Sequence, residues 1–282
     1  ATPFDPVRRR VGDRRVPEQE NVKTTVSGAT DFGIARNGTF VFIPGASRPE
    51  RRLVWVDRQG RSEPLLPAPD DYWVPRLSPD GTRLAVGVGT DIYSIELKRL
   101  TRDRVTFGTT GTLFPFTWFD NSRILFSKVE NKTGLDIYST PADGSGTPEL
   151  LLKGVNRQWA TSVAPGGTIA MYEQHPTTLR DIWLLPPDRT RTKFLATPYQ
   201  ERVARYSPNG RWIAYVSNDS GRDEVYVRAA SGGRKVTISH DGGTEPVWAA
   251  NGRELFYRNG ARLYAGSVGT EATFEAVTAR VM

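Results

Sequence analysis

The sequence contains no cysteine, so disulfide bonds and metal sites built from thiolates are both excluded. Histidine is almost as rare, with His175 and His240 the only two in 282 residues. We expect both to lie in exposed loops, because the surrounding stretches YEQHPTT and ISHDGGT are loop-like. A site of two histidines and a carboxylate would need these dissimilar stretches to converge, so the sequence predicts no metal ion and no other cofactor.

Long apolar stretches are also missing, and none approaches the 18 residues that indicate a membrane-spanning helix. We therefore expect no membrane insertion. No segment shows a convincing amphipathic helical pattern. Glycine (27) and proline (20) are plentiful, while 38% of residues are hydrophobic and 10% aromatic. This composition is typical of a globular chain with many turns.

The charge balance is basic, with a formal net charge of +7. Five arginines lie close to the start of the chain: Arg8, Arg9, Arg10, Arg14 and Arg15. A nucleic-acid binder would use such charge on phosphates. No recognised nucleic-acid motif accompanies it, so we interpret the charge as a basic surface and expect no nucleic-acid partner.

A ten-residue pattern recurs six times and determines the predicted fold. Each copy has an apolar or large residue, a short turn, a pivot residue and then an apolar run. The pivots are Gly38, Gly81, Ser122, Gly167, Gly210 and Gly252, at intervals of 43, 41, 45, 43 and 42 residues. Sequences such as Pro79-Asp80-Gly81 predict a tight turn, since glycine accepts positive φ. Each copy therefore predicts a β-hairpin.

A second signal follows each pivot by 10 to 15 residues and predicts a third strand. It reads LVW (53–55), DIY (91–93), DIY (136–138), DIW (181–183), EVY (224–226) and RLY (262–264). A polar turn and a fourth short strand usually come next. Four antiparallel strands about every 43 residues is the spacing of a propeller blade.

The sequence thus predicts an all-β fold, a six-bladed β-propeller of four-stranded antiparallel blades around a central channel. We expect residues 1–282 to form this single unit, with blades starting near residues 30, 73, 114, 159, 202 and 244. Trp118, Tyr206 and Trp248 occupy one repeat position, and we expect them to fill the wedge between neighbouring blades.

The last blade needs an outer strand, because an open sheet edge invites association. Residues 262–267 are expected to be its third strand. Two segments could supply the fourth: residues 15–22, within an N-terminal stretch 1–25 that could close the ring, or residues 274–281. The sequence leaves both open.

The repeats LSPDGTRLAV and RYSPNGRWIAYVSNDSGRDEVYVR resemble those of TolB-type (PD40) six-bladed propellers, and the resemblance spans essentially the whole chain. It implies a bacterial, extracytoplasmic sensor or scaffold module, periplasmic or secreted. It also implies a kinase domain in the parent chain as one arrangement, since similar propellers form the C-terminal half of some bacterial Ser/Thr kinase proteins. The pattern is specific for the fold and weak for function.

The stretch TDFGIARNGTF (30–40) resembles the magnesium-binding loop of such kinases. A kinase would need a glycine-rich loop, a lysine and a histidine-containing catalytic loop before Asp31, and the 30 preceding residues contain none of these. We interpret Asp31-Phe32-Gly33 as part of the first strand of the first repeat. The string Asp143-Gly144-Ser145-Gly146 lacks the spacing of a nucleophile elbow and predicts a hairpin turn.

Loops that enter the innermost strands should converge on one mouth of the channel. By repeat register they carry the predicted ligand-binding residues Asp71, Tyr72, Trp73, Phe114, Arg157, Trp159, Glu201, Arg202 and Glu245. Aromatic side chains beside arginine and glutamate are typical of a pocket for a peptide or polar ligand. No catalytic residue is predicted.

We expect a non-catalytic binding, sensor or scaffold propeller that recognises a protein, a peptide or a polar small ligand at the channel mouth. One alternative is a hydrolase or lyase that uses carboxylates and histidine there. Another is a purely structural propeller unit.

Overall fold

The structure is a computed structural model that describes residues 50–107, 115–129, 134–271, 273–276 and 279–282, with short strands at 4–5, 10–11, 32–34 and 40–42. The chain forms two compact units. Ala1–Arg51 with Pro69–Asp71 make the N-terminal unit, and Arg52–Ala68 with Tyr72–Met282 make the propeller unit. None of the described residues forms a helix long and apolar enough to cross a lipid bilayer.

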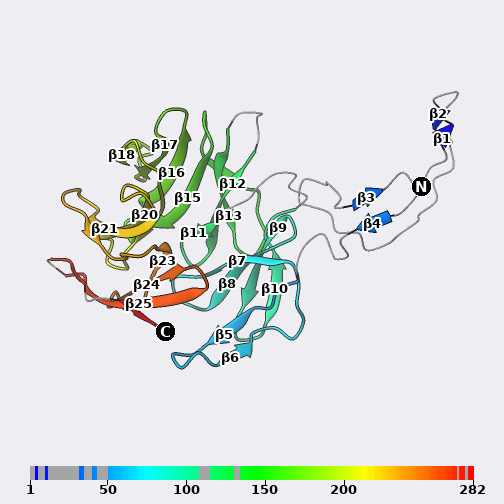
Figure 1. Ribbon diagram of the computed structural model, residues 1–282, viewed down its shortest axis with the longest axis horizontal. Helices are drawn as coiled ribbons and strands as arrows, with labels where there is room; N and C mark the ends of the chain where they lie inside the picture. The colour runs from blue at the N-terminus through cyan, green and yellow to red at the C-terminus, as the bar shows by residue number, and fades with distance from the viewer. Residues whose placement is uncertain are drawn as a thin grey trace. The chain divides into compact units, whose positions relative to one another are not determined.

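Five antiparallel sheets, blades A to E, make up most of the propeller unit (Figure 1). Blade A contains β7 (Tyr72–Leu77), β8 (Arg83–Val88), β9 (Asp91–Glu96) and β10 (Thr101–Arg104). Blade B contains β11 (Thr117–Trp118), β12 (Arg123–Lys128), β13 (Asp136–Pro141) and β14 (Glu149–Leu152). Blade C contains β15 (Gln158–Val163), β16 (Ile169–His175), β17 (Leu179–Leu185) and β18 (Thr192–Leu195). Blade D contains β19 (Glu201–Tyr206), β20 (Trp212–Ser217), β21 (Glu224–Ala229) and β22 (Val236–Thr237).

Blade E is completed by the C-terminal end of the chain. It contains β23 (Thr244–Trp248), β24 (Glu254–Asn259), β25 (Arg262–Gly269), β26 (Glu275–Ala276) and β27 (Arg280–Val281). Both β26 and β27 pair with β25, at Val268↔Ala276 and at Tyr264↔Val281. Of the two closing segments left open by the sequence, the C-terminal one therefore supplies the outer strand, while residues 15–22 lie outside the described residues.

The all-β propeller of small antiparallel sheets is confirmed, but the prediction of six blades is wrong by one. The first repeat gives two separate ladders, β3 (Phe32–Ile34) with β4 (Phe40–Phe42) and β5 (Val54–Val56) with β6 (Ser62–Pro64). A further ladder joins β1 (Phe4–Asp5) and β2 (Arg10–Val11).

The first repeat differs from the others in strand length and proline content. Strands β3 to β6 have three residues each, whereas β8, β9, β12 and β13 have six, so each short ladder offers fewer hydrogen bonds. Pro44 and Pro49, between β4 and β5, also lack the N–H group that a ladder needs. Phe32 and Gly33 of the kinase-like triplet lie in β3, and Asp31 is outside the described residues.

The hairpin turns confirm the predicted role of the pivots. Gly81, Gly167, Gly210 and Gly252 have φ of +71°, +81°, +72° and +69°, the left-handed region that glycine enters without steric cost. Ser122 replaces glycine in blade B. There the Asp120 carboxylate accepts hydrogen bonds from the backbone N–H groups of Ser122 and Arg123 at 2.7 and 2.9 Å, which stabilises the turn.

The predicted wedge position of the aromatic residues is also confirmed. Trp118 packs in a cluster with Ala85 and Ile92 of blade A, and Tyr206 packs with Ala170 and Ile182 of blade C. The indole N–H of Trp118 also donates to a carbonyl of blade A at 2.8 Å. The aromatic residue of one blade therefore fills the space against the preceding blade.

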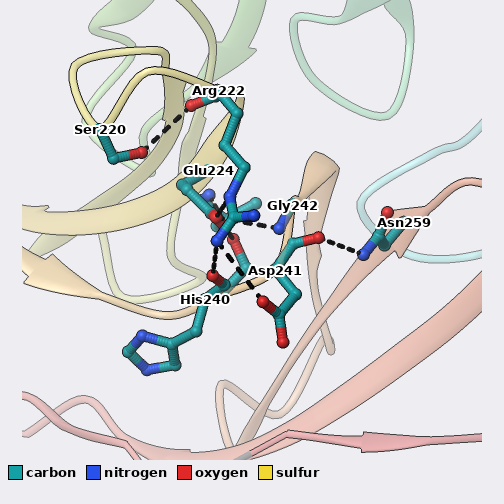
Figure 2. A network of polar contacts seen from close by, with 9 residues as sticks. Ser220, Arg222, Glu224, His240, Asp241, Gly242 and Asn259 are labelled. Atoms are coloured by element: carbon teal, nitrogen blue, oxygen red, sulfur yellow. Dashed lines mark hydrogen bonds and ion pairs between the residues drawn. The ribbon is translucent and has the colours of Figure 1, made fainter.

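An acidic side chain at the start of the third strand ties blades A, B and D to their outer strands, through Arg104 in β10, Gly154 just after β14 and Ser239 just after β22. In blade C the equivalent Asp181 accepts from the Thr178 hydroxyl instead, at 2.8 Å. These residues, Asp91, Asp136, Asp181 and Glu224, are all buried. In blade D, Glu224 accepts hydrogen bonds from the backbone N–H of Gly242 and from Arg222, both at 2.9 Å (Figure 2). It also accepts one from the Ser239 hydroxyl. The acidic residue at the start of the D-I-Y signal therefore stabilises its own blade.

Candidate functional site

The innermost strands of the five blades lie next to one another around the propeller axis. β7 contacts β11, β11 contacts β15, β15 contacts β19 and β19 contacts β23. Four of the five, β7, β15, β19 and β23, carry a register shift against the next strand of their blade. In β7, Trp73 and Arg76 pair with Gly87 and Ala85, so the inner strand holds one extra residue there.

The extra residue takes a left-handed conformation in three of these bulges. Val74, Val203 and Glu245 have φ of 47°, 56° and 55°. Such φ is strained for a β-branched side chain, and strain of this kind tends to cluster at binding sites. Two residues after each valine stands an arginine, Arg76 in β7 and Arg205 in β19.

The two arginines are fixed in equivalent ways by the next blade. The indole N–H of Trp118 donates to the carbonyl oxygen of Arg76 at 2.8 Å. The indole N–H of Trp248 donates to the carbonyl oxygen of Arg205 at 2.9 Å. The backbone of each arginine is therefore held at a blade junction, close to the axis.

Arg76 and Arg205 are half-buried, and their guanidinium groups make few hydrogen bonds. Nη1 of Arg76 donates to the carbonyl of Pro75 at 2.9 Å, and Nη1 of Arg205 donates to the carbonyl of Thr161. The Nε atoms of both arginines are buried and have no hydrogen-bond partner in the part of the chain that the structure describes. Among the described residues neither guanidinium forms an ion pair. A buried donor without an acceptor is costly, and a buried charge more so.

Positive charge exceeds negative charge around Arg76 and Arg205. Burial lowers the pKa of Arg205 to about 9, and repulsion from Arg76 acts in the same direction. Burial also lowers the pKa of Arg76, against the attraction of Glu245. Glu245 is itself held by Arg258, at 2.8 and 3.2 Å, and that bond lowers the pKa of its carboxyl group. The carboxylate of Glu245 is thus already paired with a third arginine, Arg258.

We call Arg76, Arg205 and Glu245 the axial cluster. Of the predicted site residues only Glu245 belongs to it. The sequence offered a signal for the arginines, since each lies five residues before its pivot, Gly81 or Gly210. Strict two-residue alternation would place Arg76 and Trp73 on opposite faces, and the bulge puts them on the same face.

The predicted aromatic residues of blade A belong to the core. Tyr72 is 5% exposed and packs with Leu53 and Leu84. Trp73 packs edge-on against Phe116, and its indole N–H donates to the carbonyl of Gly89 at 3.0 Å. Both side chains therefore fix the blade.

The remaining predicted residues are spread over several environments. Trp159 stacks on Tyr172 with ring centroids 4.8 Å apart, while Arg157 is exposed. Asp71 lies in the N-terminal unit, 3.4 Å from Arg51. Phe114 lies outside the described residues.

Glu201 and Arg202 have unlike surroundings although they are neighbours in β19. Arg202 forms an ion pair with Asp223 of its own blade, at 3.0 Å. Glu201 is 1% exposed and accepts a hydrogen bond from the Thr197 hydroxyl, and its second carboxylate oxygen has no partner within the described ranges. Burial raises the pKa of Glu201, and repulsion from Asp181 adds to this. The charged form of Glu201 is therefore unfavourable inside blade D.

The histidines do not share a site in the described part of the chain. His240 is exposed, as predicted, and its ring points away from the contacts that its backbone makes with Arg222 (Figure 2). His175 differs from the prediction, because it ends β16, is half-buried and contacts the Thr177 hydroxyl at 3.0 Å. No group of three metal-ligating side chains occurs among the described residues.

The Asp143–Gly146 string forms a turn. The Asp143 carboxylate accepts from the backbone and hydroxyl of Ser145 at 3.0 and 2.7 Å, and Gly144 has a φ of +72°. The hairpin-turn prediction is confirmed, and the Ser145 hydroxyl is engaged by the turn itself.

Comparison with solved structures places the fold beside known propellers. A putative TolB from Agrobacterium tumefaciens is 18% identical with a TM-score of 0.62, covering 81% of this chain and 88% of that one. TolB from Acinetobacter baumannii is 20% identical with a TM-score of 0.62, covering 82% and 59%. An oligogalacturonate lyase in complex with manganese is 15% identical with a TM-score of 0.55, covering 80% and 70%.

No protein-family model and no curated protein matches the chain. At these identities the likeness concerns the fold alone. The TolB-like resemblance inferred from the repeats is therefore confirmed at the level of the propeller architecture, which this chain shares with TolB.

Proposed function

We propose that this chain is a non-catalytic binding propeller that recognises a polar ligand or a peptide at its innermost strands, beside the axial cluster. The observation that carries the proposal is the pair of half-buried arginines whose Nε atoms lack partners among the described residues. Protein interiors rarely keep unpaired charge, and such groups concentrate where a ligand completes the set.

Titration calorimetry on the full 282-residue chain tests this function. The panel contains acidic, basic and neutral peptides together with acidic and neutral oligosaccharides. We expect saturable binding with one site per chain for at least one class. Turnover of a panel member without any stoichiometric binder would overturn the proposal, and no binding at all would favour a purely structural unit.

A lyase or hydrolase is the second candidate, and Glu201 favours it. A buried carboxyl group with a raised pKa is the kind of group that general acid–base catalysis uses. An oligogalacturonate lyase also shares the fold. Incubation with oligogalacturonate and manganese, monitored for unsaturated products, is the test. Product formation abolished by Glu201→Gln or Glu245→Gln would support the enzyme, and an unchanged substrate would reject it.

The setting of the domain is part of the same proposal. The resemblance favours an extracytoplasmic location, a protein or peptide partner, and a kinase domain in the parent chain. Fractionation of the source cell with an antibody to this domain tests the location. Recovery in the cytoplasmic fraction alone would reject it.

A further inference from the structure

We propose that Arg76 and Arg205 form a carboxylate-binding site on the propeller axis. This inference rests on the proposed binding function and names the chemistry of the ligand. The site would take a ligand that carries carboxylate groups, from an acidic peptide or from a uronic-acid oligosaccharide.

The position of the two arginines is the first argument. They occupy the same place in the repeat, two residues after a left-handed bulge residue, Val74 or Val203. They come from blades A and D, with two blades between them, and their charges still act on each other. Both arginines lie on innermost strands, where the separate blades converge on the axis.

The free donors of the guanidinium groups are the second argument. In each group Nη1 is occupied by a backbone carbonyl, of Pro75 or of Thr161. Each Nε is buried, and neither Nε nor Nη2 makes a hydrogen bond to a described residue. The Nε–Nη2 edge of arginine presents two parallel N–H groups, which match the two oxygens of a carboxylate.

The charge balance is the third argument. Glu245 attracts both arginines, but Arg258 already binds both of its carboxylate oxygens. These three arginines and one glutamate therefore carry an excess of two positive charges. Carboxylates placed on the two free edges would supply both the acceptors and the missing negative charge.

The fixed backbone makes the site selective for geometry as well as charge. Trp118 and Trp248 hold the carbonyls of Arg76 and Arg205 from the adjacent blades. The backbone positions of both arginines are therefore fixed, which favours a ligand with two suitably spaced carboxylates over a single free ion. Isolated acetate or chloride would gain little from this arrangement.

The test uses the full chain, a triglutamate peptide, trigalacturonate and inorganic phosphate, with binding measured by titration calorimetry. The variants are Arg76→Gln, Arg205→Gln and Arg205→Lys. Arg234→Gln is the matched control, because Arg234 is exposed in the connection between β21 and β22. We expect either acidic ligand to bind the wild-type chain, at least tenfold loss in both Gln variants, partial loss in the Lys variant and no change in the control.

A thermal-shift measurement separates loss of the site from loss of the fold. Removing an unpaired buried charge should leave the melting temperature of the Gln variants equal to or above that of the wild type. The acidic ligand should then raise the melting temperature of the wild type and not that of the variants.

Each outcome decides the inference. Binding of the peptide alone, of the trigalacturonate alone or of both supports the carboxylate site and identifies its source. Binding of phosphate alone, or equal binding by wild type and Gln variants, overturns it. Binding of neutral ligands alone overturns the carboxylate site while the proposed binding function stands, and no binding by any ligand rejects both.

Discussion

Single buried residues in this chain make the stability of the fold depend on pH. The carboxyl group of Glu201 is an example, since burial and the charge of Asp181 raise its pKa above the ordinary 4.5. The folded state then holds the proton more tightly than the unfolded state. Stability from this group is fully present below pH 4.5 and is lost as the pH rises through the folded pKa.

Glu201→Gln should therefore stabilise the chain at neutral pH, because the amide keeps the Thr197 contact without a buried charge. The gain in melting temperature over wild type should be clear at pH 7 and should shrink below pH 4.5, where both side chains are neutral. Calorimetric melting across this range is the measurement. The exposed Glu271→Gln serves as control, and a loss of stability in Glu201→Gln at pH 7 would contradict the argument.

Residue identities within the repeat could be predicted where one local cause fixes them. The glycine pivots follow from turn geometry, and the exposed position of His240 follows from its polar surroundings. The axial arginines could not be found this way, because a bulge breaks the two-residue alternation on which the facing of strand residues depends. Tyr72 and Trp73 look like ligand contacts in sequence, yet contacts from distant segments place them in the core.

At the scale of elements, the hairpin turns depend on glycine for backbone conformation alone. A Cβ on Gly81 would meet nothing within 4 Å, but its φ is +71°. Gly81→Ala should therefore cost about 1–2 kcal/mol of unfolding free energy through strain. Gly166 is also in open space but has no positive φ, so Gly166→Ala should be neutral or slightly stabilising. Equal effects of the two substitutions in urea unfolding would contradict this explanation.

The junction between blades A and B depends on one indole hydrogen bond. Trp118→Phe keeps most of the apolar volume and removes the donor to the Arg76 carbonyl, so we expect a loss of about 1–2 kcal/mol. Trp55→Phe is the matched control, since Trp55 is 41% exposed in β5 and should change stability by less than about 0.5 kcal/mol. Urea unfolding of both variants checks the difference.

The blades themselves were predictable because each repeat contains its own turn, its own apolar strands and its own third-strand signal. The first repeat shows the limit of that reasoning. Its pivot and its LVW strand have the right spacing, yet its strands are short and two prolines separate β4 from β5. A repeat pattern reports turns and strands reliably but does not guarantee that four strands join in one sheet.

For the propeller unit as a whole, the C-terminal strands close blade E. Deletion of residues 274–282 would remove β26, β27 and Phe274. The ring centroid of Phe274 lies 5.3 Å from that of Trp212 and 6.2 Å from that of Trp248. We expect a loss of about 2–4 kcal/mol and self-association through the exposed edge of β25. Calorimetry and light scattering test this, with Phe274→Ala as the variant that loses only the ring. A truncated chain that stays monomeric with unchanged melting would contradict the closing role.

The bulges of the innermost strands allow these strands to vary in length by one residue. Because Trp73 and Arg76 pair with Gly87 and Ala85, the segment between them already contains one more residue than the ladder consumes. Loss of that surplus residue would leave both flanking pairs in register and both side chains on their present faces. Evolutionary deletions of one residue should therefore be tolerated at this point of β7, and at its counterpart in β19, without changing the face on which the arginines lie.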